Sequence, residues 1–155
     1  MIDIDTSKIE PLAERVLDAY KKLLAEKDIN ASGNLSDTAT VDITLNNNKL
    51  QVIFNLDHYW KYVEYGRRPG KMPPISAIEE WIKIKPIVPD PINGKIPNNR
   101  QLAFMIARKI GREGIPGKKP LTETAYSDET ENVIQSIRNE IIRQLNQYLL
   151  SKVKD

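Results

Sequence analysis

The chain lacks cysteine altogether and has a single histidine, His58, among its 155 residues. A disulfide framework and thiolate chemistry are therefore excluded. One histidine without cysteine is a poor start for a zinc site, which needs about four N, S or O ligands. Nothing around His58 has the signature of a serine or threonine nucleophile. We therefore expect no metal, no cofactor and no enzyme activity, and an enzyme is the least favoured class.

Long apolar runs are also missing. No stretch of the sequence approaches the length of a membrane span, so we expect no membrane partner. The N-terminus reads Met1-Ile2-Asp3-Ile4-Asp5 and lacks the basic region and apolar run of a secretory signal. The chain is thus expected to be made, and to stay, in an aqueous compartment.

The chain also lacks a large net charge. Its 23 basic residues are nearly balanced by 21 acidic ones, so the net charge is +2. This balance argues against nucleic-acid binding as the main task. Contacts with DNA, or with an acidic partner, would have to come from local basic clusters. The candidates for such contacts are Lys71, Arg108, Lys109, Arg112, Lys118 and Lys119.

The composition is that of a globular protein, with 40% hydrophobic and 28% charged residues. A length of 155 residues fits one domain, so residues 1–155 are taken as a single domain. Seven of the ten prolines lie between Pro69 and Pro97. They predict long irregular connections in this third of the chain, including a proline-rich loop at residues 86–97.

Apolar residues spaced three and four apart predict an amphipathic helix near the N-terminus, ending near Asp28. Ser7 and Glu10 resemble a capping box for its start. The same spacing predicts a short helix at residues 75–84 and a helix from Asn98 or Asn99 to residues 111–114. A long C-terminal helix is predicted to begin at residue 127 or 128.

Two runs of alternating apolar and polar residues, at 40–45 and 50–56, predict a β-hairpin that turns at residues 46–48. Because two strands alone make a weak sheet, we expect either a third strand at Leu121 to Tyr126 or a strand from a neighbouring subunit. The predicted fold class is α+β. It combines an amphipathic N-terminal helix, a hairpin or small sheet packed against helices, and a long C-terminal helix.

The segment directly after the hairpin is aromatic and then basic. Tyrosine and arginine are enriched at the centres of protein interfaces. Part of this segment must pack on the hairpin, and the remainder is the best candidate for a protein interface. The candidate interface residues are Tyr59, Tyr62, Glu64, Tyr65, Arg67 and Arg68.

The chain resembles the neck, head–tail connector and tail-completion proteins of tailed bacteriophages. An amphipathic helix leads into Ser32-Gly33-Asn34-Leu35, which is similar to the Ser-Gly-x-Leu turn of this family, and a hairpin follows. Tyr62-Val63-Glu64-Tyr65-Gly66 then resembles the family's Tyr-x-x-Tyr-Val-Glu-Tyr/Phe-Gly segment, with Tyr59 in place of the earlier tyrosine. The resemblance extends over most of the chain. It departs where Arg67-Arg68-Pro69 replaces the frequent threonine and where the 86–97 loop is longer than usual.

The resemblance implies a virion component, synthesised in the host cytoplasm, that forms a homo-oligomeric ring at the head–tail junction. Its partners would be portal or adaptor proteins and tail proteins, with non-specific contact to the DNA that passes through the ring. It further implies, for Glu64, a charge-assisted bond to an arginine or to loop amides; a local bond that holds the turn ending at Gly66 is the alternative. A tail terminator ring fits the same pattern. A small DNA-binding regulator using Arg108, Lys109 and Arg112 is an alternative of a different class.

Overall fold

The computed structural model describes residues 4–29, 34–46, 49–85, 87–91 and 94–153. The fold is α+β, as predicted. The elements, in chain order, are η1 (Thr6–Lys8), α1 (Glu10–Glu26), α2 (Asn34–Asp37), β1 (Thr40–Asn46), β2 (Lys49–Asn55), α3 (Trp60–Tyr65), β3 (Gly66–Arg67), α4 (Ile75–Ile84), α5 (Asn99–Glu113), β4 (Ile115–Pro116), α6 (Pro120–Ala125) and α7 (Asp128–Val153).

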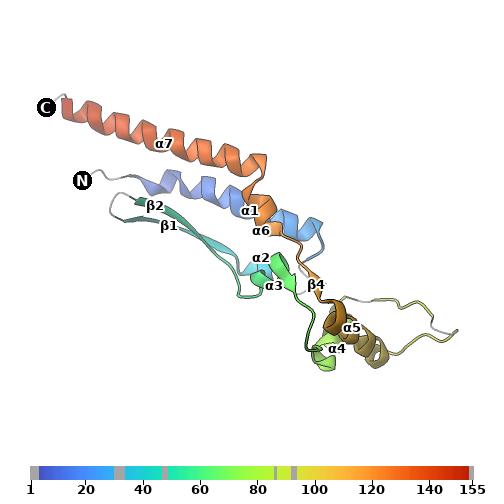
Figure 1. The fold of residues 1–155 in the computed structure, drawn as a ribbon. Coiled ribbons are helices and arrows are strands. Elements are labelled where there is room, and N and C mark those ends of the chain that lie inside the picture. The colour runs from blue at the N-terminus through green and yellow to red at the C-terminus, as the bar shows by residue number, and fades with distance from the viewer. Residues whose placement is uncertain (1–3, 30–33, 47–48, 86, 92–93, 154–155) are drawn as a thin grey trace.

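Helix α1 lies between α7 and the β1–β2 hairpin, as Figure 1 shows. Its buried face carries Ala13, Leu17, Tyr20 and Leu24, which recur at helical spacing. Arg15 pairs with Glu129 near the start of α7, and the backbone of Asp5 bonds to Gln144 farther along α7, so the two helices run antiparallel.

The start of α1 differs from the prediction. Asp5 caps the preceding turn η1 by accepting hydrogen bonds from the amide and the hydroxyl of Ser7. Ser7 is therefore a donor to Asp5, and no side chain caps α1 itself, which has Pro11 in its first turn. Proline suits that position because its missing N–H would be unsatisfied in any case.

The hairpin is confirmed, and its register places apolar residues opposite one another. Val41 pairs with Phe54, Ile43 with Val52 and Leu45 with Leu50, so one face of the ribbon is apolar. These six side chains are only half-buried. Within the described ranges β1 and β2 pair only with each other. The predicted turn falls partly on residues 47–48, which lie outside the described residues.

The third strand predicted at Leu121 to Tyr126 is wrong, because this segment forms helix α6, with Pro120 in its first turn. Helix α6 packs on α1 and α3. The main core gathers Tyr20, Leu24, Leu35 and Val63, and Leu121 of α6 packs against it. The segment is thus used to cover the core rather than to widen the sheet.

Helices α4 and α5 form a separate lobe, which Figure 1 shows at the opposite end of the molecule from the C-terminus. They pack on each other around Ile82, Leu102 and Ala103. Helix α5 begins with a capping box between Asn98 and Gln101, in agreement with the predicted helix start. The bounds of α4 also match the prediction.

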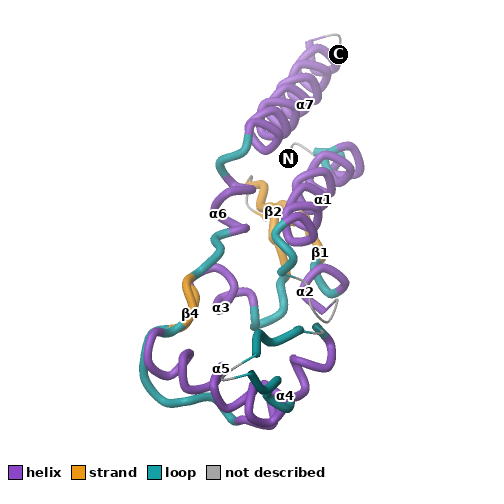
Figure 2. The backbone as a smooth tube through the Cα atoms, turned by 90° about the vertical axis from the view of Figure 1, so that its right-hand side faces the viewer, coloured by secondary structure: helices purple, strands orange, loops and turns teal. Residues whose placement is uncertain are grey.

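Two antiparallel segments, 63–71 and 111–118, join this lobe to the rest of the chain, and we call them the neck (Figure 2). Strands β3 and β4 pair within it, and the amide of Lys118 bonds to the Val63 carbonyl at 2.9 Å. At the lobe end the amide of Gly70 bonds to the Gly111 carbonyl at 2.8 Å. Five of the seven glycines lie in these two segments.

Close backbone approach explains the glycines. A Cβ at Gly66 would lie 2.1 Å from the Ile115 carbonyl oxygen, and one at Gly114 would lie 2.2 Å from that of Arg67. Both residues also have positive φ angles, 75° and 77°, which side chains disfavour. A Cβ at Gly117 would lie 2.2 Å from the carbonyl oxygen of Glu64. The two segments can therefore lie this close only with glycine at these positions.

Candidate protein-interaction surface

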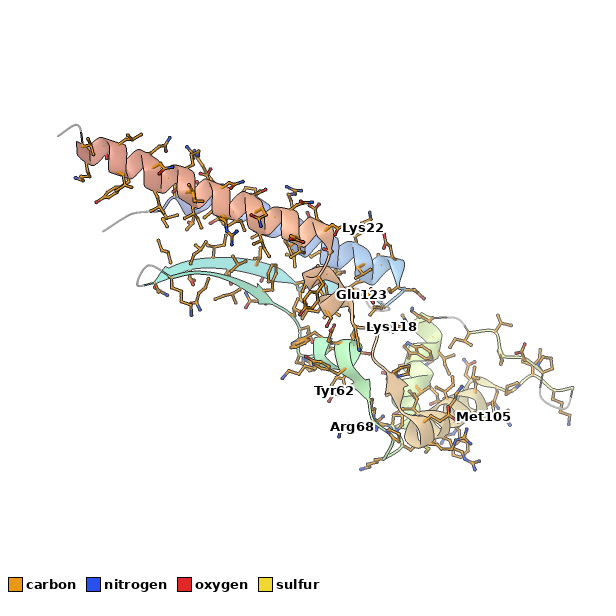
Figure 3. The ribbon with its side chains drawn as sticks, turned by 45° about the horizontal axis from the view of Figure 1, so that its top comes forward. Lys22, Tyr62, Arg68, Met105, Lys118 and Glu123 are labelled. Atoms are coloured by element: carbon orange, nitrogen blue, oxygen red, sulfur yellow. The ribbon has the colours of Figure 1, made fainter. Side chains whose placement is uncertain are left out.

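Three tyrosines on and beside α3 form an exposed aromatic group. Tyr59, Tyr62 and Tyr65 follow one another at three-residue spacing, which places them along one side of a helix. They are 55%, 57% and 73% exposed, whereas Val63 of the same helix is buried. The rings of Tyr59 and Tyr62 lie 6.1 Å apart. We call these three residues the tyrosine surface; Figure 3 labels Tyr62 within it.

Glu64 differs from the other interface candidates because its side chain lies inside the chain, 2% exposed. Its carboxylate accepts hydrogen bonds from the backbone amides of Leu121 at 2.9 Å and Thr122 at 3.1 Å, and from the Thr122 hydroxyl. These amides belong to the first turn of α6, and its N-cap residue, Lys119, cannot cap them because a lysine side chain has no hydrogen-bond acceptor. Glu64 therefore caps α6 from α3.

Tyr20 is buried in α1, and the negative charge of the Glu64 carboxylate acts on its phenol group. Burial and then the charge of Glu64 raise the pKa of Tyr20 to about 12. Both effects disfavour the phenolate, which would be a second negative charge in a poorly solvated place. The Glu64 site is thus a charged centre of the main core, built from α1, α3 and α6.

The two arginine candidates lie in the neck, next to the tyrosine surface. Arg67 is half-buried in β3, and its guanidinium donates to the carbonyl of Lys71, which holds the turn toward α4. Arg68 is exposed and forms no ion pair with another described residue. Arg68, three residues after Tyr65 in the chain, therefore remains free to contact a partner.

The remaining basic candidates gather around the neck, on its two segments and on the adjoining end of α5. Residues 61–71 and 108–119 together carry nine basic residues and two acidic ones, and one of those two is the buried Glu64. Arg112 is paired with Glu113, and Lys118 donates to the Lys27 carbonyl at 3.1 Å. Within the described residues, the basic candidates whose side chains form neither an ion pair nor a hydrogen bond are Arg68, Lys71, Arg108, Lys109 and Lys119.

His58 lies at the surface between the hairpin and α3. Its imidazole is 91% exposed and stands 2.9 Å from the carboxylate of Asp57. Across the described ranges, no group of three or more histidine, cysteine, aspartate or glutamate side chains is placed to hold a metal ion. His58 and Asp57 thus form one exposed pair at the surface.

Exposed apolar side chains elsewhere were missed by sequence reasoning. Ile134 and Leu149 belong to the periodic stripe of α7, yet they are 52% and 58% exposed. Tyr126, directly after α6, is 88% exposed. For Leu149 the length of α7 was the available signal, because its 26 residues extend about 39 Å and α1, with 17, about 25 Å. A longer helix cannot bury its whole stripe on a shorter one.

Comparison of the chain with protein-family models, with curated proteins and with solved structures gave no match. Among the described residues, no helix has the length and apolar character needed to cross a membrane.

Proposed function

We propose that this chain is a structural protein of a tailed bacteriophage virion, which forms a ring at the head–tail junction around the DNA channel. The amount of exposed surface carries the proposal. The chain has 11171 Å² of accessible surface, whereas a compact monomer of its mass has about 8000 Å². Two contacts of standard size, one on each side of a ring subunit, would cover about 1600 Å² of it.

The chemistry of that surface supports contacts between proteins. The exposed tyrosine surface is followed in the chain by the exposed Arg68, and tyrosine and arginine are the residue types found at the centres of interfaces. It lies directly after the hairpin, where the family that the sequence resembles has its tyrosine-rich segment. The half-buried apolar face and free edges of the β1–β2 ribbon offer a second surface that neighbours would complete.

The basic neck supports contact with a polyanion within such a ring. Residues 61–71 and 108–119, which include the neck, hold nine basic residues against two acidic ones in a chain of net charge +2, and this is a strong local concentration of charge. We infer that the exposed basic residues around the neck contact passing DNA without reading its sequence.

The test is to purify particles of the phage that encodes the chain and to image their head–tail junction by electron microscopy. We expect the chain in the particles, as a ring between the portal and the tail. Absence of the chain from purified particles would contradict the proposal. A ring that caps the tail tube and binds only tail proteins would instead identify a tail terminator.

Substitutions separate the interface from the fold. Tyr62→Ala with Arg68→Ala is expected to cost about 2 kcal/mol or more of binding free energy, and so to reduce incorporation into particles. Tyr126→Ala is the matched control, because this side chain is exposed and lies outside the tyrosine surface. Equal incorporation of the two variants would argue against the tyrosine surface as the contact.

A DNA-binding regulator is the second candidate, and the basic neck is the observation that favours it. A band-shift titration at several salt concentrations distinguishes the two. Ring contacts to DNA predict weak binding that is equal for unrelated sequences and falls steeply with salt. A preference for one sequence, retained against competitor DNA, would favour the regulator.

A further inference from the structure

The carboxyl end of α1 is held by three lysines. Lys118 of the neck donates to the carbonyl of Lys27 at 3.1 Å, and Lys27 in turn donates to the carbonyl of Lys118 at 3.1 Å. Lys27 also forms an ion pair with Glu123 of α6 at 2.5 Å, and Figure 3 labels Glu123 and Lys118. Lys85, at the end of α4, donates to the carbonyl and to the carboxylate of Asp28, both at 2.6 Å. We call Lys27, Lys85 and Lys118 the lysine clasp.

The end of a helix is a favourable place for these ammonium groups. The last carbonyl groups of a helix lack partners within it and carry the negative end of its dipole. Asp28 follows the C-cap residue of α1 in a left-handed conformation, with a φ angle of 49°. The hydrogen bond from Lys85, and then its charge, lower the pKa of the Asp28 carboxyl below its ordinary value. The lobe is thus attached to α1 through an ion pair and a bond to the helix end.

The apolar clusters of the lobe and of the main core are built from different segments. The lobe cluster draws on residues 75–106, whereas the main cluster draws on residues 20–63 and Leu121. The side chain of Lys85 is 25% exposed and that of Asp28 is 86% exposed, so water and ions reach the pair. Ion pairs that water reaches contribute little stability. The contact that holds the lobe on α1 is therefore one that a small change in free energy can break.

We propose that the lobe is movable: the Lys85–Asp28 contact holds it against the end of α1, and it pivots on the neck when that contact breaks. The neck offers a place for the pivot at its lobe end. A Cβ at Gly70 would meet nothing within 4 Å, whereas Gly66 and Gly117, closer to the main core, are tightly enclosed. Hinges are a few residues of this kind, whose backbone has room to change.

The inference concerns the chain by itself. It can fail while the proposed ring stands, and the ring can fail while the lobe still moves.

Two spin labels measure where the lobe lies, because the chain has no cysteine of its own to be labelled. Glu14→Cys on α1 and Ala77→Cys on α4 place the labels at exposed positions of the main core and of the lobe. Pulsed electron spin resonance gives the distribution of distances between the labels, and we expect one dominant distance. Lys85→Met removes both bonds to Asp28 but keeps the aliphatic stem, so it should raise the population at other distances about fivefold. An unchanged distribution would overturn the inference.

Lys22→Met is the matched control. It makes the same substitution at an exposed lysine whose ion pair, with Glu26, stays within α1. The distribution of distances should not change, and a change as large as that of Lys85→Met would contradict a specific role of the Lys85 contact. Asp28→Asn should have a smaller effect than Lys85→Met, because it keeps the carbonyl that accepts from Lys85 and because asparagine tolerates the left-handed conformation.

A second pair of labels, both in the lobe, separates movement from unfolding. Ala77→Cys on α4 with Lys109→Cys on α5 should keep a single distance in the Lys85→Met protein, because the packing of α4 on α5 does not involve the clasp. Broadening of this distance would mean that the lobe itself has loosened, and it would contradict a lobe that moves as one body.

Discussion

At the scale of single residues, Glu64 connects the sequence pattern to the fold. Its carboxylate caps α6 by accepting from two backbone amides that lie 57 and 58 positions later in the chain. A charge-assisted bond to loop amides was one of the roles predicted for this residue, and the observed bonds go to amides in the first turn of α6. That α6 is a helix was missed, because its cap comes from so far away in the sequence.

Glu64→Gln is expected to destabilise the protein by about 1–3 kcal/mol, because the amide keeps the shape but turns an N–H group toward backbone donors. Chemical denaturation followed by circular dichroism measures the change. Glu80→Gln on the exposed side of α4 is the control and should change stability by less than about 0.5 kcal/mol. Equal effects of the two substitutions would mean that the buried bonds contribute little.

Tyr20 provides a second prediction, through pH. Its pKa is about 12 in the folded chain and 10.0 when unperturbed. The fold therefore favours the protonated phenol, and this contribution is complete below about pH 10 and is lost as pH rises toward about 12. In an absorbance titration, one of the six tyrosines should ionise after the others. Tyr20→Phe should remove this late step; if the step persists, another tyrosine is responsible.

At the scale of elements, the spacing of apolar residues predicted the helices and strands that depend only on neighbouring residues. The periodic apolar residues of α4 and α5, and the alternation in β1 and β2, gave the correct element types because each needs only neighbouring residues. The neck could not be predicted in this way. Its backbone pairing joins residues about 50 positions apart, as Arg67 and Ile115 show, and no periodic pattern marks it.

The glycines of the neck permit a matched comparison. Gly66 and Gly94 share a φ angle of 75°, but a Cβ at Gly94 would meet nothing within 4 Å. Gly94→Ala should cost about 1 kcal/mol, from the strained backbone alone. Gly66→Ala should cost about 1–3 kcal/mol more, because its Cβ would collide with the Ile115 carbonyl. Thermal unfolding of both variants measures this difference, and similar values would show that the neck can open without penalty.

At the scale of the whole molecule, the separation of the lobe from the main core gives an extended particle. A compact chain of 155 residues has a radius of gyration of about 15 Å. The excess surface and the two distinct buried clusters predict a larger value for the dilute protein in small-angle X-ray scattering. A value near 15 Å would mean that the lobe folds back onto the main core in solution, and it would remove the argument from exposed surface.

The pairing of Gly66 and Arg67 with Pro116 and Ile115 also means that the chain leaves and re-enters the main core at adjacent positions. Residues 68–114 therefore form an insertion between two paired residues, Arg67 and Ile115. Joining Arg67 to Ile115 through an Asn-Gly turn would close a tight hairpin that the strand pairing already prepares. The shortened polypeptide should keep the hairpin, α1 and α7, and the same splice point would accept a foreign peptide for display.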